Sequence, residues 1–354
     1  FAPMSTFKAL LGLFFAWFLT SCVLDGAPET ITYVLHRSVT LYVRFQPGSN
    51  ERGVSPELVA AERMAGLARF TSTDATGFRE HMAKFTAAPR RPLKGTEVST
   101  LTVGQAKAIL VVAPGVSNTP STRTILHFHG GGYVGGEALA EFCSVISQIA
   151  RARVLSVNYR LAPEYPLPAA VDDGLAAFNY LTRDLKVDPK NIVVMGESAG
   201  GGLGLLLLQR LRDDKSALPA GAAVSSPWTD LSCSGKSYQT NANTDAILSH
   251  ESLIPVAREV TRLPQTDSLV SPLFANWEGL PPMLITAAKG EVLLDDSVKA
   301  AAAAEKAGVD VSLEIEDTVL HCYQLFHFLS PETSHAIARY AGFARQLLDR
   351  PSSM

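Results

Sequence analysis

Residues 191–203 read NIVVMGESAGGGL. An apolar, β-branched run (191–195) leads directly into the pentapeptide GESAG (196–200), and an apolar helical stretch follows at once. This is the G-x-S-x-G pattern in the strand–turn–helix setting that presents a serine hydroxyl on a sharp, strained turn. The stretch therefore predicts an α/β fold with Ser198 as a nucleophile. The alternative is a glycine-rich loop that holds an ordinary serine.

The surrounding sequence alternates between strand-like and helix-like segments. Apolar, β-branched runs predict strands at 96–103, 106–114, 124–129, 153–159, 191–196, 222–227, 283–288 and 311–316. Amphipathic stretches predict helices at 137–151, 168–184, 199–212, 295–307 and 332–349. Continuous apolar strands that alternate with helices are typical of a parallel sheet covered on both faces.

Two regions interrupt this alternation. The first has helical patterns at 30–46, 56–70 and 76–86, and the second is polar and turn-rich with one short helix at 249–262. We predict that residues 28–95 and 230–276 form a helical cap. The remaining residues, 96–229 and 277–354, then form the α/β core.

Composition excludes several classes of protein. The formal net charge is −3 and no extended basic block occurs, so a nucleic-acid partner is not expected. The four cysteines form no C-x-x-C pair, which argues against zinc fingers and thioredoxin-like chemistry. His127 and His129 lie two positions apart but have no companion cluster of ligands, so no metal site is predicted.

The N-terminal segment 1–27 differs from the rest of the chain. Residues 9–24 (ALLGLFFAWFLTSCVL) carry no charge, but this run is shorter than the roughly 20 residues of a spanning helix. We expect a helix that anchors the protein at a membrane surface, or a secretory signal. The alternatives are a lipoprotein cleavage box ending at Cys22 and a helix packed on its own domain or on a second copy in a homodimer. Accordingly, localisation is expected at a membrane or in the secretory pathway, and cytoplasmic if the helix packs on the domain.

The glycines of HGGG (129–132) follow the strand predicted at 124–129. Consecutive glycines leave backbone N–H groups free to point at a developing negative charge. The N–H groups of Gly131, Gly132 and Ala199 are therefore candidates for an oxyanion hole. A phosphate-binding loop is the competing interpretation, but the sequence lacks a Walker lysine and the G-x-G-x-x-G spacing here.

Four ordered motifs together resemble the hormone-sensitive-lipase-like branch of the α/β-hydrolases, the microbial family IV esterases. They are HGGGYVGG (129–136), NYRLAPEYPLPAAVDD (158–173), GESAGGGL (196–203) and SPWTDL (226–231). A later acid and histidine extend the resemblance to roughly residues 95–349. It implies an eight-stranded, mostly parallel sheet, a cap built from N-terminal helices and an insertion after the sixth strand, and no metal or organic cofactor.

The resemblance also points to the base. The triad order is serine, acid, histidine, and His321 in TVLHCYQLF (318–326) matches the family's histidine motif. Cys322 stands where the family usually has glycine. We expect this thiol to be a packing residue, with a redox-sensitive or inhibitor-reactive site as the alternative. His327 is a rival base but fits no motif.

The acid is predicted from AKGEVLLDDS (288–297). Laid on the family's Asp-Pro-Leu-x-Asp motif, this stretch places Glu291 in the triad, and Asp295 is the alternative. Glutamate suits the role, because the acid orients the imidazole and takes no proton itself. Asp295 and Asp296 are expected to begin a helix, where acidic side chains are favourable.

The sequence thus predicts a serine carboxylesterase that acts on short- to medium-chain esters through a covalent acyl-enzyme. Its partner is a small-molecule ester, bound in an apolar pocket near Tyr133 and Trp228. Glu197 either helps to place water or the acidic network, or is a solvated or salt-bridged residue. The alternative functions are an amidase or deacetylase of aryl amides with the same triad and a receptor-like homologue that binds ligand without turnover.

Overall fold

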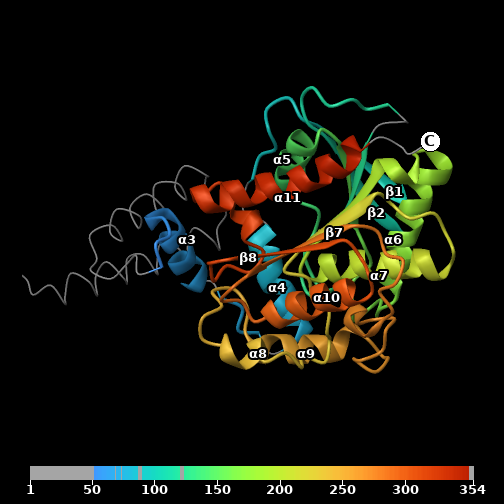
Figure 1. The fold of residues 1–354 in the computed structure, drawn as a ribbon. Helices are drawn as coiled ribbons and strands as arrows, with labels where there is room; N and C mark the ends of the chain where they lie inside the picture. Colours follow the sequence, from blue (N-terminus) through green and yellow to red (C-terminus); the bar gives the residue numbers. More distant parts are fainter. Residues whose placement is uncertain (1–51, 68, 73, 87–89, 120–122, 351–354) are drawn as a thin grey trace, which may run out of the picture.

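The computed structural model describes residues 52–67, 69–72, 74–86, 90–119 and 123–350. Within them, eight strands form one sheet in the order β1-β2-β4-β3-β5-β6-β7-β8 (Figure 1). The strands are β1 Glu97–Val103, β2 Ala106–Val112, β3 Thr124–Phe128, β4 Arg153–Asn158, β5 Ile192–Glu197, β6 Gly221–Ser225, β7 Met283–Ala288 and β8 Val311–Glu316. β2 runs antiparallel to both β1 and β4, and every other neighbouring pair is parallel. The expected mostly parallel, eight-stranded sheet is confirmed.

Helices cover both faces of the sheet. α5 (Ala140–Ala150) and α11 (Pro331–Asp349) lie on one face, and α6 (Ala169–Asn179), α7 (Ala199–Asp213) and α10 (Leu294–Lys306) lie on the other (Figure 1). Neighbouring residues of β3 show why. Ile125 belongs to the apolar cluster that holds α5 and α11, whereas Leu126 belongs to the cluster that holds α6 and α7. Because strand side chains alternate between faces, one buried strand contributes side chains to the apolar clusters on both faces of the sheet.

The helix predicted at 168–184 differs from the structure in its last turn. α6 ends at Asn179, and a π-helical turn follows over Tyr180–Asp184. The Leu185 N–H donates to the Tyr180 carbonyl at 3.0 Å, which is an i to i−5 bond. The Thr182 hydroxyl donates to the Phe178 carbonyl at 2.9 Å. A side-chain donor at this place competes with the regular ladder, which favours the wider turn.

The two regions predicted as cap pack on each other. The first holds α3 (Pro56–Leu67) and α4 (Ala75–Thr86). Residues 230–276, called the insertion segment below, hold α8 (Ser237–Thr240), α9 (His250–Val260) and a 3₁₀ turn (Pro272–Phe274). The Phe70 N–H donates to the Ile247 carbonyl at 2.8 Å, and α4 contacts α9. The domain boundaries themselves stay sequence-based predictions.

The apolar stretch 9–24, the whole N-terminal segment 1–27 and the helix predicted at 30–46 lie outside the described residues. Of the helices that the structure does describe, none is both long and apolar enough to cross a membrane.

Candidate active site

Ser198 occupies a strained turn between β5 and α7. Its backbone has φ 55° and ψ −121°, in a region that side-chain-bearing residues rarely adopt. The two flanking glycines are required by space: a Cβ at Gly196 would lie 2.4 Å from the Gly200 carbonyl oxygen, and one at Gly200 would lie 2.0 Å from the Phe128 carbonyl oxygen. The Ser198 N–H donates to the Ser225 carbonyl at 2.9 Å, which ties the turn to β6.

The HGGG loop lies beside this serine. A Cβ at Gly130 would meet the Ser198 Cβ at 3.4 Å, and Gly131 and Gly132 have φ angles of 120° and 64° that favour glycine. The N–H groups of Gly131, Gly132 and Ala199 donate to no acceptor among the described residues. Ala199 is the first residue of α7, where N–H groups have no partner within the helix. These three donors are available to a negative charge at the serine.

Glu291 and His321 meet although 30 positions separate them in the sequence. His321 Nδ1 lies 2.6 Å from Glu291 Oε2, and Glu291 Oε1 accepts the Ala288 N–H at 2.9 Å. Both side chains are buried. The bond from the Ala288 N–H holds the carboxylate in one orientation, so that Oε2 faces the imidazole.

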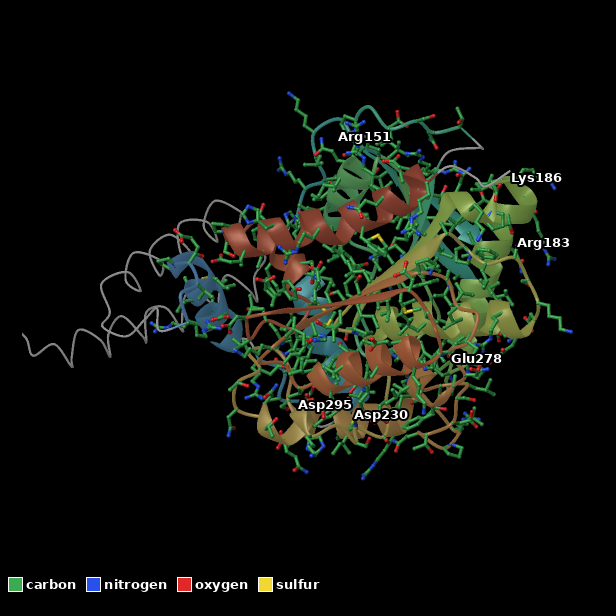
Figure 2. All side chains as sticks on the ribbon, in the orientation of Figure 1. Arg151, Arg183, Lys186, Asp230, Glu278 and Asp295 are labelled. Carbon is green, nitrogen blue, oxygen red and sulfur yellow. The ribbon has the colours of Figure 1, made fainter. Side chains whose placement is uncertain are left out.

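The alternative acids and base have other partners. Asp295, labelled at the start of α10 in Figure 2, accepts the Lys236 N–H at 2.6 Å. Asp296 is buried and accepts the Thr229 N–H at 2.8 Å. His327 Nε2 lies 2.7 Å from Glu141 Oε1 on α5. Among the described residues, none of these three makes a hydrogen bond to His321 or Ser198.

Cys322 contacts the nitrogen that a base would use. Its Sγ lies 3.3 Å from His321 Nε2, and its N–H donates to the Ser226 hydroxyl at 3.1 Å. In the described chain, Ser198 Oγ makes no hydrogen bond to His321. Cys322 is buried as expected, and its φ of 53° is one that glycine adopts more easily. The direct contact with the imidazole was not foreseen from the sequence.

The pKa values of this pair are shifted. Burial alone would lower the pKa of His321, but Cys322 and Glu291 raise it well above 6.5. Burial raises the pKa of the Cys322 thiol, although His321 opposes this. The His321 imidazole therefore accepts a proton more readily than an ordinary histidine does.

Glu197, next to Ser198, forms a buried ion pair. Both of its oxygens lie near His127 Nε2, at 2.9 and 3.1 Å, and His127 Nδ1 lies 2.8 Å from the Ser156 hydroxyl. Burial alone would lower the pKa of His127, but Glu197 and Cys143 raise it to about 10. Of the interpretations of Glu197 drawn from the sequence, the structure favours the salt bridge. His127 as its partner was missed, because nothing in the sequence pairs β3 with β5.

Two further residues hold the site together and carry no sequence signal. Gln324 accepts the Ser225 hydroxyl at 2.6 Å and donates to the Thr286 hydroxyl at 2.7 Å, which ties the histidine loop (residues 317–326) to β6 and β7. The Tyr340 hydroxyl on α11 lies 3.0 Å from the carbonyl oxygen of Gly196. This contact therefore fixes the end of β5, the strand that precedes Ser198.

The two residues predicted near the substrate pocket lie together. The ring centroids of Tyr133 and Trp228 are 6.2 Å apart, and both side chains are buried. The Trp228 backbone N–H donates to the Ser198 carbonyl at 2.9 Å. A Cβ at Gly202 would lie 2.7 Å from the Tyr133 hydroxyl, so α7 packs closely on this pair. Burial raises the pKa of the Tyr133 hydroxyl.

Comparison with known proteins identifies the family. Residues 125–325 match a family model described as an alpha/beta hydrolase fold. A solved esterase of the bacterial hormone-sensitive lipase family is 35% identical, with a TM-score of 0.76 over 83% of this chain and 99% of that one. The chain belongs to the hormone-sensitive-lipase-like esterases. The resemblance drawn from the motifs is thereby confirmed.

Other relatives of this esterase agree. The esterase EstE5, soaked with p-nitrophenyl butyrate, is 35% identical with a TM-score of 0.77 over 84% of this chain and 100% of that one. An acetyl-hydrolase of Streptomyces hygroscopicus is 37% identical over 63% of this chain and 75% of its own length. The carboxylesterase/phospholipase LipF of Mycobacterium tuberculosis is 33% identical over 72% of this chain and 70% of its own. The protein is a serine carboxylesterase.

Proposed function

We propose that this esterase hydrolyses short- to medium-chain carboxylic esters with Ser198 as nucleophile, His321 as base and Glu291 as the orienting acid. The 2.6 Å contact between His321 Nδ1 and Glu291 Oε2 carries the proposal. A carboxylate at Nδ1 keeps the proton there and leaves Nε2 free to accept one. The naming of one relative as an acetyl-hydrolase and the soaking of another with p-nitrophenyl butyrate support short acyl chains.

The reaction proceeds in two acyl-transfer steps. Nε2 of His321 takes the Ser198 proton while Oγ attacks the ester carbonyl, and the N–H groups of Gly131, Gly132 and Ala199 bind the resulting oxyanion. The alcohol leaves with the proton from Nε2, and water then attacks the acyl-enzyme in the same way. No metal or organic cofactor takes part in these steps.

Formation of the serine–histidine hydrogen bond is part of substrate binding in this scheme. In the structure, His321 Nε2 faces the Cys322 thiol at 3.3 Å. Catalytic hydrogen bonds are often long in unliganded sites and tighten in the substrate complex. We therefore expect Nε2 to exchange its thiol partner for the Ser198 hydroxyl when an ester enters.

A panel of p-nitrophenyl esters, from acetate to dodecanoate, and the matching acyl anilides tests this function. We expect kcat/KM to be highest for the shorter esters and to fall by about 1,000-fold or more in Ser198→Ala. Anilides cleaved faster than esters would instead support an amidase or deacetylase. Absence of turnover with both substrate types would support the receptor-like alternative.

We also propose that residues 9–24 hold the enzyme at a membrane surface. The support is their apolar composition, which matches an interfacial or anchoring helix. Removal of residues 1–27 should move the protein from the membrane fraction to the soluble fraction of the expressing cells. Unchanged partitioning would refute this proposal.

A further inference from the structure

The insertion segment forms hydrogen bonds to the loop that carries Glu291. This acid loop, residues 289–292, follows β7, and four side chains of the insertion segment bind it. Three of them donate to its backbone carbonyls: Asn241 Nδ2 to Lys289 (3.1 Å) and Glu291 (2.9 Å), Thr244 Oγ1 to Gly290 (2.9 Å), and Ser237 Oγ to Val292 (2.6 Å). The fourth, Asp245, accepts the Val292 N–H at Oδ2 (2.8 Å). The backbone on both sides of the Glu291 side chain is thus held from outside the α/β core.

Asp245 is the charged member of this set. Its side chain is only 2% exposed. Oδ1 accepts the N–H groups of Ile247 and Leu248, both at 2.8 Å, and Oδ2 accepts the N–H of Val292. Within the described ranges no lysine or arginine pairs with this carboxylate. A buried carboxylate that only backbone groups satisfy is costly to ionise, so a nearby positive charge has a large effect on it.

That positive charge comes from His321. Burial raises the pKa of Asp245 to about 6, and the electrostatic influence of His321 is the largest of those that lower it. The coupling is mutual: an ionised Asp245 favours a protonated His321. The geometry agrees: Glu291 contacts the imidazole directly, and Asp245 binds the backbone of the next residue, Val292.

The histidine loop is held from the same segment. The Ala246 N–H, adjacent to Asp245, donates to the Val319 carbonyl at 3.0 Å. On the other side, Glu62 of α3 accepts the Val319 N–H at 3.1 Å and the Thr318 hydroxyl at 2.9 Å. Consecutive residues of the insertion segment thus bind the acid loop and the histidine loop.

We propose that Asp245 is a positioning residue for the catalytic reaction: it holds the acid loop in place through Val292 and supplies a second negative charge that stabilises protonated His321. The inference rests on the proposed triad. His321 is protonated in both tetrahedral intermediates, so a fixed negative charge nearby favours both acyl-transfer steps.

The charged groups around the imidazole determine the pH dependence to be tested. His321 contacts Glu291 of the acid loop and its neighbour Cys322, and it has an electrostatic influence on Asp245 of the insertion segment. Glu197 on β5 acts on Cys322. Removal of the Asp245 charge should lower the pKa of His321, whereas the remaining groups are unchanged.

Asp245→Asn tests the proposal, because it removes the charge and, at nearly the same size, leaves one acceptor oxygen for the three N–H groups that the carboxylate binds. We expect kcat for p-nitrophenyl butyrate to fall by about 10- to 100-fold with KM within about 3-fold of wild type. We also expect the acidic limb of the kcat/KM profile to move about one unit to lower pH. A residue with a merely structural role would leave that limb in place. An unmoved limb in a folded Asp245→Asn enzyme would overturn the proposal whatever its kcat.

Asp230→Asn is the matched control. Asp230, labelled near α10 in Figure 2, is a buried carboxylate of the same segment that accepts the N–H groups of Ser232 and Ser234 but none of the acid loop. We expect wild-type kcat and a wild-type acidic limb. The same changes in Asp230→Asn as in Asp245→Asn would show general loosening of the segment and overturn the proposal.

Thr244→Val decides the matter if Asp245→Asn does not fold. Thr244 is exposed, so the change removes its bond to the Gly290 carbonyl without disturbing a core. A fall of about 3-fold in kcat at unchanged KM supports the positioning role, and no fall refutes it. Glu291→Gln, assayed alongside, separates this outcome from failure of the triad: an active Glu291→Gln enzyme would refute the triad itself.

Discussion

Replacement of Glu291 by glutamine is the sharpest test of the site. The two carboxylate oxygens have different partners, the Ala288 N–H at Oε1 and His321 Nδ1 at Oε2. Glutamine has one oxygen and one NH₂ group, so it cannot satisfy both. If its oxygen keeps the Ala288 N–H, its NH₂ group faces Nδ1 and forces the imidazole proton onto Nε2. That tautomer cannot accept the serine proton.

The magnitude follows from the alternatives open to the variant. If the amide flips, its NH₂ group faces the Ala288 N–H, which leaves buried donors unpaired at a cost of about 1–3 kcal/mol. The variant also loses the charge that stabilises the imidazolium. A wrong tautomer in a serine–histidine–acid triad lowers kcat by about 10,000-fold in a well-studied protease. We therefore expect kcat of Glu291→Gln to fall by about 1,000- to 10,000-fold, which is ~4 to 5.5 kcal/mol of activation free energy.

The assay is the initial rate of p-nitrophenyl butyrate hydrolysis across a range of substrate concentrations, with Asp295→Asn as the control. Among the described residues, Asp295 accepts only the Lys236 N–H, and asparagine can keep that bond, so we expect less than about a 3-fold change in kcat. Circular dichroism would check that both variants are folded. The reasoning is refuted if Glu291→Gln keeps more than about a tenth of wild-type kcat, or if Asp295→Asn is the more damaged enzyme.

Three further predictions concern the groups around the triad. His127→Asn leaves Glu197 buried without its cation, so urea unfolding at pH 7 should show a loss of about 3–5 kcal/mol. The pKa of His127 is raised to about 10, so the stabilisation from its ion pair with Glu197 is complete below pH 6.5 and is lost as pH rises through about 10. The stability difference between His127→Asn and wild type should therefore shrink in alkaline buffer. Burial and Asp230 raise the pKa of Asp296 from 3.8 to about 7, so the folded state loses stability as pH rises across that range. Asp296→Asn stays neutral and should raise the melting temperature by about 3 °C at pH 8 but not at pH 4; an equal shift at both would contradict the assignment. Cys322→Gly removes the thiol that competes for His321 Nε2 and should raise kcat/KM for p-nitrophenyl butyrate by about 2- to 5-fold; a fall would show that the thiol assists the base.

Much of the fold was predictable because its signals are local. All eight predicted strands are present, since short apolar runs bounded by turns need little context. The insertion segment was recognised as a break in the alternation, although the four-residue helix α8 within it was too short to leave a pattern. The helix predicted at 168–184 was wrong only in its π-helical end, because a single threonine hydroxyl perturbs a ladder that periodicity treats as uniform.

The sequence by itself determined where the reactive serine and the oxyanion-hole candidates lie. Those positions depend on backbone angles and on spaces that only glycine fits. A few adjacent residues, such as Gly196 and Gly200, are enough to meet both requirements. The tertiary structure decided which buried groups meet: Glu291 and not Asp295 contacts His321, and Asp245 binds the Val292 N–H beside Glu291. A buried polar atom takes whichever partner the packing of distant segments brings within about 3 Å, and no local pattern records that distance.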